Sequence, residues 1–243
     1  MTTQEFSSSF DTLLDSYAHQ AIFGKDASEA DLRFDEYEKS VFLTKAQEEV
    51  ALALYNGRNS SLEGFEETEE LRRYLSNLIC EAELDPIESS NGKPIGLNSK
   101  SKFFTLPDGT GTLPAVWFIT YEAATVSDGK CENTTSMEVV PVKQDEYHRI
   151  KKNPFRGANS RRSLRMDLSE GMVEIISEYT VTKYYIRYLR KLNPIIVATL
   201  DDQSIDGINI VTECELPDYL HQRILERAVN LAIQRGKINN ENK

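Results

Sequence analysis

The chain has 243 residues, of which 28% are charged and 40% are hydrophobic, and its formal net charge is −11. This is the composition of an ordinary globular protein; no apolar run approaches the roughly 18 residues of a membrane-spanning helix, and the first residues do not have the pattern of a secretory signal. The three cysteines lie far apart without a CxxC or Cys/His cluster, so neither a disulfide framework nor a zinc site is expected. This use of cysteine favours a protein of a reducing compartment.

Two amphipathic helices are predicted before residue 60. The first, Thr2–His19, opens with a Thr-x-x-Glu capping box. The second covers residues 35–55, either as one interrupted helix or as two joined end to end, because Asp35 and Thr44 are both cap signals. Asn56-Gly57 is expected to end this second helix.

The third predicted helix, Glu66–Cys80, has the most regular apolar stripe. The acids in its first turn suit the positive end of the helix dipole, and adjacent carboxylates on a helix do not converge on a metal. Pro and Gly residues between Asp85 and Lys102 then predict a loop. Residues 1–90 hold 20 acidic and 7 basic residues, a balance that disfavours non-specific binding of DNA through this region.

Short β-branched and aromatic segments separated by turn residues follow this loop. They predict strands at 102–106, 115–126, 137–143, 163–168, 172–177, 182–190, 194–200 and 208–213. Strands this short favour an antiparallel sheet or a small sandwich. A short helix is expected at about 144–152, within a stretch, residues 143–165, that holds eight Lys or Arg against two acids. Such a basic stretch is either simply solvated or meets an acidic surface.

Leu216-Pro217 opens a last amphipathic helix, which Gly236 is expected to end. The apolar face of this helix and those of the N-terminal helices need cover, and packing them together is the economical solution. We therefore predict an α+β protein in which a helical bundle carries an inserted antiparallel β-sheet or sandwich. In this division residues 1–96 are the N-terminal part of the bundle, 97–213 are the inserted β-domain, and 214–243 are the last helix with a polar tail.

No group of residues predicts catalysis. The three histidines, His19, His148 and His221, are scattered, and none lies at metal-ligand spacing from another donor. Motifs of P-loop, dinucleotide-binding, serine-hydrolase and zinc-protease sites are missing. We therefore expect no catalytic residue, no metal and no cofactor. The aromatic and basic residues around Tyr184–Tyr188 either stack single-stranded nucleic acid or form a strand with one wet face.

Three stretches, Phe34–Gly57, Val139–Leu168 and Glu213–Ile233, resemble a known family. The second contains the distinctive YHRIKKNPFRG, and in the third an LP pair is followed by a helix with AVNLA. They resemble the ring, or head–tail connector, structural proteins of crAss-like bacteriophages, and the likeness covers most of the chain. The resemblance implies a virion protein, assembled in the host cytoplasm, that forms a ring of about twelve copies docked under the portal protein and contacts other tail ring proteins. It also implies a channel through which genomic DNA passes without specific binding, and no membrane partner.

A closed ring needs a contact between two different faces of the same chain. The acidic N-terminal third and the basic stretch are natural opposite partners, and a channel wall dominated by Glu and Asp would let DNA slide. We expect six cations at an interface between subunits or tiers: Lys151, Lys152, Arg156, Arg161, Arg162 and Arg165. Two alternatives are a nucleic-acid-binding module that uses the basic 143–165 loop, and an enzyme such as a phage nuclease. The lack of convergent carboxylates counts against the enzyme.

Overall fold

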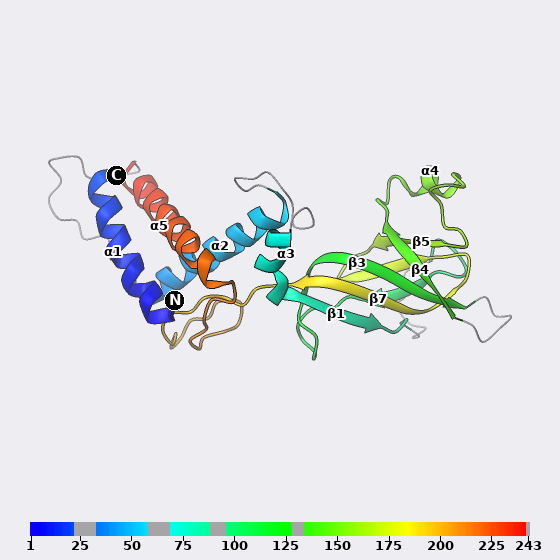
Figure 1. Cartoon of the computed structure of the whole chain (residues 1–243), viewed down its shortest axis with the longest axis horizontal. Coiled ribbons are helices and arrows are strands. Elements are labelled where there is room, and N and C mark those ends of the chain that lie inside the picture. The colour runs from blue at the N-terminus through cyan, green and yellow to red at the C-terminus, as the bar shows by residue number, and fades with distance from the viewer. Residues whose placement is uncertain (22–32, 58–68, 88–95, 128–133, 242–243) are drawn as a thin grey trace. The chain divides into compact units, whose positions relative to one another are not determined.

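The computed structural model describes residues 1–21, 33–57, 69–87, 96–127 and 134–241. The chain divides into two compact units. One combines residues 1–77 with residues 192–243 and holds α1, α2, α3 and α5, and the other is the continuous segment 78–191, which holds the sheet and α4 (Figure 1). Four of the five helices of the described chain thus lie outside the unit that holds the seven-stranded sheet, which confirms the predicted α+β class.

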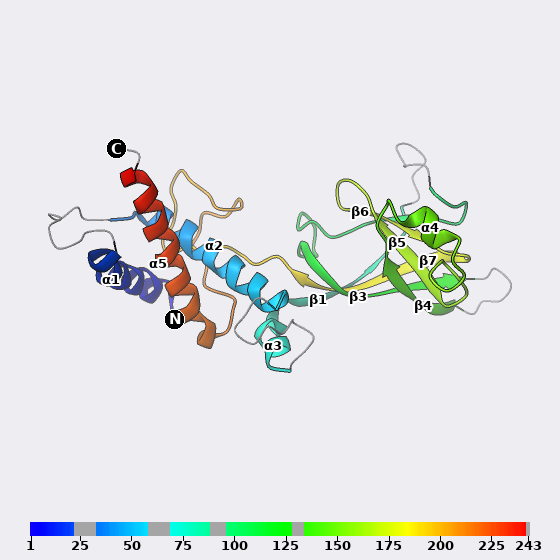
Figure 2. The same cartoon turned by 90° about the horizontal axis from the view of Figure 1, so that it is seen from above.

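Three helices of the first unit, α1 (Thr3–Ala21), α2 (Glu36–Tyr55) and α5 (Asp218–Glu241), pack against one another (Figures 1 and 2). Each contributes a stripe of apolar residues at helical spacing, as predicted. The buried members are Phe6, Phe10 and Leu14 of α1, Leu43, Ala46, Val50 and Leu54 of α2, and Leu220, Ile224, Leu225, Ala228 and Ala232 of α5.

The predicted helix starts are confirmed by their hydrogen bonds. The Thr2 N–H donates to Glu5 over 2.8 Å and the Glu5 N–H donates to the Thr2 hydroxyl over 3.3 Å, which is a reciprocal capping box. Asp35 accepts the Glu38 N–H over 2.7 Å at the start of α2. The helix α2 ends at Tyr55, and Gly57 follows with a φ of +68° that suits glycine. The expected stop at Gly236 is wrong, since α5 continues to Glu241; one glycine costs a helix only about 1 kcal/mol.

Residues 196–213 form an irregular hairpin, named here the acidic hairpin. Asp206 and Gly207 have φ values of +51° and +79°, and the residues on either side, Ile205 and Ile208, exchange two hydrogen bonds of 2.9 Å. Positive φ at both central residues is what a tight two-residue hairpin turn requires. The strands expected at 194–200 and 208–213 are wrong, because these arms are joined by an isolated bridge between Ile196 and Thr212 and by one bond of 2.8 Å from the Leu200 N–H to the Asn209 carbonyl, without a continuous ladder.

Polar side chains of α2 explain why one arm needs no strand partner. Ser40 and Thr44 accept the N–H groups of Val197 and Ile195, each over 3.1 Å, and Gln47 donates to the Asn193 carbonyl over 2.9 Å. Ser40 and Gln47 are fully buried. Thr44 is therefore not a cap between two helices, as one alternative had it, but a residue in the middle of one continuous helix that binds the base of the acidic hairpin to α2.

The second unit is built on one sheet in the order β1-β7-β3-β4-β5-β6-β2. Neighbouring strands are antiparallel except β4 and β5, which are parallel. The sheet is therefore mixed, and the prediction of a purely antiparallel sheet is wrong. The strands are β1 (Ile79–Leu84), β2 (Lys102–Thr105), β3 (Val116–Ser127), β4 (Thr134–Pro141), β5 (Arg162–Asp167), β6 (Met172–Ile176) and β7 (Thr180–Arg190).

The predicted helix Glu66–Cys80 is the main error in the element assignment. Residues 66–68 lie outside the described residues; α3 covers only Glu69–Tyr74, a short 3-10 turn follows at Ser76–Leu78, and Ile79 already starts β1. All six residues of β1 pair with β7. In β1, Glu81 and Glu83 alternate with Ala82, so the period changes from helical to strand-like within the predicted element. The sheet therefore begins before residue 97, where the predicted β-domain starts, and before the first predicted strand at 102–106.

Candidate functional site: the basic excursion between β4 and β5

The parallel pairing of β4 and β5 determines the course of the chain between them. Glu138 lies opposite Arg162 and Pro141 lies opposite Arg165, so the chain that leaves the end of β4 must return to the beginning of its neighbour. A tight turn cannot do this, and a crossover connection is required. Residues 142–161 make this connection, named here the basic excursion, and it contains the short helix α4 (Tyr147–Lys151) close to the predicted position (Figure 1).

One side of the basic excursion is anchored on the sheet. Tyr147 is buried and packs with Leu164, Met166 and Ile176, and Ile150 packs against the same cluster. The Val142 N–H donates to the Arg165 carbonyl over 2.8 Å, and the Gln144 amide donates to the Asp167 carbonyl over 2.8 Å. The excursion is therefore fixed to the sheet near its start.

The tip of the excursion is a hydrogen-bonded turn centred on Asn153. Its side-chain oxygen accepts the Phe155 N–H over 2.9 Å, and its carbonyl accepts the N–H groups of Arg156 and Gly157 over 3.2 and 2.8 Å. These bonds hold a segment whose aromatic side chain, that of Phe155, is 85% exposed. An aromatic ring presented to solvent on a well-ordered turn loses little conformational entropy on contact with a partner.

Gly157 is required for this turn. A Cβ at position 157 would lie 3.0 Å from the Asn153 carbonyl oxygen and 3.3 Å from that of Ile150. We expect Gly157→Ala to loosen the tip at a cost of about 1–3 kcal/mol, seen as faster hydrogen exchange of the Arg156 amide and its neighbours. Gly111→Ala is the matched control, since nothing lies within 4 Å of its added methyl. Equal exchange in both variants and the wild type would contradict the assignment.

The six cations predicted from the sequence separate into two groups. Lys151, Lys152, Arg156 and Arg161 are exposed and have no carboxylate within ion-pair distance among the described residues. Arg162, by contrast, is half-buried; it donates to the Phe155 carbonyl over 3.1 Å and lies 3.6 Å from Glu138. It therefore links the backbone of the tip to β4. The sixth cation, Arg165, lies in β5.

Arg165 belongs to a buried ionic cluster within the sheet. Its guanidinium lies 2.6 Å from Glu122, and the two side chains are 11% and 8% exposed. The Tyr184 hydroxyl donates to the other Glu122 oxygen over 2.6 Å, and Asp167 lies 3.0 Å from the guanidinium. Burial raises the pKa of Glu122 against the opposing effect of Arg165, and burial together with Glu122 raises the pKa of Tyr184, which keeps its proton for this bond.

Phe155 is the site residue that sequence reasoning missed. An aromatic residue directly after a proline, between Lys152 and Arg156 and outside any periodic segment, has no element in which to be buried. This position in the sequence is the signal that could have identified Phe155 as an exposed residue. Exposed aromatic residues on ordered loops are typical anchors of protein–protein contacts.

The tyrosines of β7 do not form a stacking surface. Tyr184 and Tyr188 are fully buried in the core, so the nucleic-acid interpretation is wrong for them. Tyr185 lies on the other face, where its hydroxyl donates to Glu81 over 2.7 Å and accepts from Arg187 over 2.8 Å. The strand therefore has one buried and one wet face.

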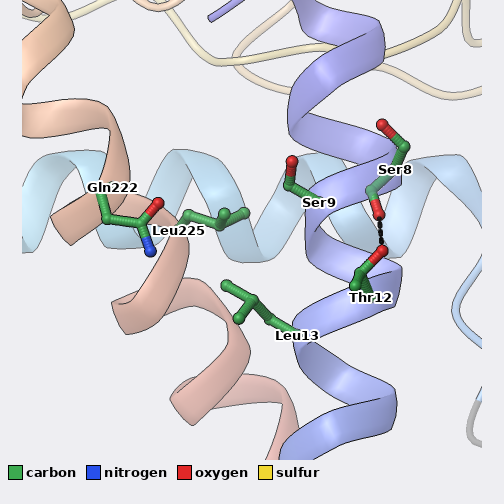
Figure 3. Close-up of a pocket in the computed structure, with 6 residues that line it drawn as sticks. All are labelled: Ser8, Ser9, Thr12, Leu13, Gln222 and Leu225. Atoms are coloured by element: carbon green, nitrogen blue, oxygen red, sulfur yellow. Dashed lines mark hydrogen bonds between the residues drawn. The ribbon is translucent and has the colours of Figure 1, made fainter.

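A groove between α1 and α5 is lined by hydroxyl, amide and aliphatic side chains, without an acid or base for catalysis (Figure 3). It is lined by Ser8, Ser9, Thr12, Leu13, Gln222 and Leu225. The hydroxyls of Ser8 and Thr12 donate to carbonyls of their own helix, over 2.9 and 2.8 Å, so they are not directed to a ligand. No charged side chain lines it.

The histidines do not converge. His221 is buried, with Nε2 2.8 Å from the Leu216 carbonyl and its ring 5.1 Å from that of Phe6, so it packs at the start of α5. His148 is exposed on α4, and the side chain of His19 lies outside the described residues. Where side chains are described, no three His, Cys, Asp or Glu residues are grouped to hold a metal ion. Within the same part of the chain, no helix has the length and apolarity needed to cross a membrane.

Comparison with known proteins agrees with a structural role. A family model described as phage tail ring protein 3/4 matches residues 1–243. The chain is 44% identical over 240 residues to ring protein 3 of Bacteroides phage crAss001, covering 96% of this chain and 95% of the relative. It is 29% identical over 242 residues to ring protein 4/5 of the same phage, covering 96% and 92%. The resemblance to crAss-like phage ring proteins is thereby confirmed, and the chain belongs to the phage tail ring protein 3/4 family.

Proposed function

We propose that this chain closes a ring of about twelve copies in the virion tail, at the junction below the portal protein, and connects head to tail there. It acts through contacts with copies of itself, with the portal and with neighbouring ring proteins. It is assembled in the host cytoplasm and performs no catalytic step.

The observation that carries this proposal is the tip of the basic excursion. A fully formed turn presents Phe155, 85% exposed, among Lys151, Lys152 and Arg156. The groove between α1 and α5 has no charged lining residue, and where side chains are described no three His, Cys, Asp or Glu residues are grouped to hold a metal ion. An aromatic anchor with a charged rim suits a protein partner. In this proposal the four exposed cations lie at the interface, while Arg162 and Arg165 hold the excursion and the sheet in shape.

The net charge supports a passive channel for DNA. At −11 per copy, a ring of these subunits is strongly acidic, and carboxylates repel phosphates, so DNA passes without being held. We propose that Glu and Asp side chains dominate the wall of the channel and that the exposed cations of the excursion face protein.

Native mass spectrometry and negative-stain imaging of the purified full chain test the proposal. We expect one closed oligomer of defined copy number, seen as rings in projection. A chain that stays monomeric at every concentration, or that instead retains labelled single-stranded DNA at low salt, would overturn it.

A further inference from the structure

The acidic hairpin carries two exposed aliphatic residues and several exposed acids. Ile210 and Val211 are 64% and 47% exposed, and exposed apolar residues next to polar ones are a feature of protein–protein contact sites. Between residues 192 and 222 there is no Lys or Arg. The exposed acids of the hairpin are Asp201, Asp202, Asp206 and Glu213.

These acids differ from those of the N-terminal third, which the sequence suggested as the partner of the basic stretch. Several of the N-terminal acids are already paired within the helical unit: Asp11 and Glu36 with Lys39, Glu49 with Arg227 and Glu69 with Arg73. Among the described residues, Asp201, Asp202 and Glu213 have no such ion pair. Their charge is available to a partner outside the chain.

The basic excursion is the complement of this surface. The excursion carries the exposed Phe155 and four exposed cations, Lys151, Lys152, Arg156 and Arg161, and the hairpin carries an exposed aliphatic pair and exposed acids. Both are ordered before contact, one by the turn at Asn153 and the other by the turn at Asp206-Gly207 and its bonds to α2. Order in both partners lowers the entropy lost on association.

We propose that the basic excursion of each copy docks on the acidic hairpin of the next copy, with Phe155 against Ile210 and Val211 and the cations against Asp201 and Asp202. The contact is heterologous, since two different surfaces of one chain meet, and repeated around a ring it leaves neither surface free. This inference rests on the proposed function, because it requires self-assembly, and it adds which surfaces make the contact.

Charge reversal tests the pairing in the full chain. One variant reverses the excursion with Lys152→Glu and Arg156→Glu, and a second reverses the hairpin with Asp201→Lys and Asp202→Lys. Each alone opposes like charges at every contact, and we expect the dissociation constant for self-association to rise at least about tenfold. Both sets of side chains are exposed, so thermal unfolding should be unchanged.

The two variants mixed in equal amounts give the decisive result. In an alternating ring every contact again joins opposite charges, so the mixture should assemble into rings with equal numbers of each variant by native mass spectrometry. A single chain carrying all four reversals should assemble as well. If the wild type forms rings and both single variants do too, or if neither the mixture nor the fourfold variant recovers assembly, the inference is wrong and the ring function stands. A wild type that forms no oligomer contradicts the function itself.

Discussion

Replacing Arg165 with alanine is expected to destabilise the sheet unit by about 3–5 kcal/mol, because it leaves the Glu122 carboxylate buried without its cation. The two side chains are 11% and 8% exposed and lie 2.6 Å apart. Trp117, the only tryptophan, lies in β3 of the same unit, so its fluorescence during urea unfolding reports this change.

Two controls separate the buried pair from surface charge. Arg156→Ala removes an exposed cation from the same basic stretch and should change the unfolding free energy by less than about 0.5 kcal/mol. Adding Glu122→Gln to an Arg165→Met variant removes both charges and should recover part of the stability lost by Arg165→Met alone. Normal unfolding of Arg165→Ala together with lost assembly would instead place Arg165 at an interface, as the sequence suggested.

The free energy of unfolding is expected to depend on pH through Glu122. Burial raises its pKa, so its contribution to stability is fully present below the unfolded-state pKa and is lost as pH rises through the folded-state value. Arg165 lowers the pKa of Glu122, so removing Arg165 raises this pKa further. The difference in stability between Arg165→Ala and the wild type should therefore become smaller as the pH is lowered, because protonation of Glu122 removes the buried charge that lacks its cation.

Phe155→Ala is expected to raise the dissociation constant for ring assembly by roughly 30-fold or more, since a central aromatic anchor contributes about 2 kcal/mol or more to a contact. Phe155 is 85% exposed, so removal of its aromatic side chain should leave the unfolding free energy unchanged. Sedimentation velocity over a range of concentrations measures the first effect, and urea unfolding followed by Trp117 fluorescence measures the second.

Tyr121→Ala is the matched control for this experiment. Tyr121 is also an exposed aromatic residue of the sheet unit, at 53%, but it belongs to β3 and not to the excursion. We expect this variant to assemble like the wild type. If Phe155→Ala and Tyr121→Ala weaken assembly equally, or if Phe155→Ala has no effect, the excursion is not the contact surface.

The sequence predicts best where local chemistry decides the structure. The caps at Thr2 and Asp35 and the stripes of α1, α2 and α5 depend on neighbours in the chain, and all are present. It fails where a distant partner decides. β1 is a strand because β7 lies beside it, and the arm after Asn193 is no strand because polar side chains of α2 bind its backbone.

The same distinction applies to the candidate site. Counting charges locates the basic stretch but cannot separate Arg161, which is exposed, from Arg165, which is buried against Glu122. That difference depends on β3, more than 35 residues away in sequence. Likewise the composition shows an acidic N-terminal third, but only the ion pairs show that several of its acids already have partners.

A reconstruction of the phage tail at side-chain resolution would show both the ring and its contacts. We expect a closed ring of identical copies of this fold, in which the Phe155 tip of each copy lies against Ile210 and Val211 of its neighbour and carboxylates line the channel. A single copy in the particle, or a basic excursion directed into the channel against DNA, would contradict this expectation.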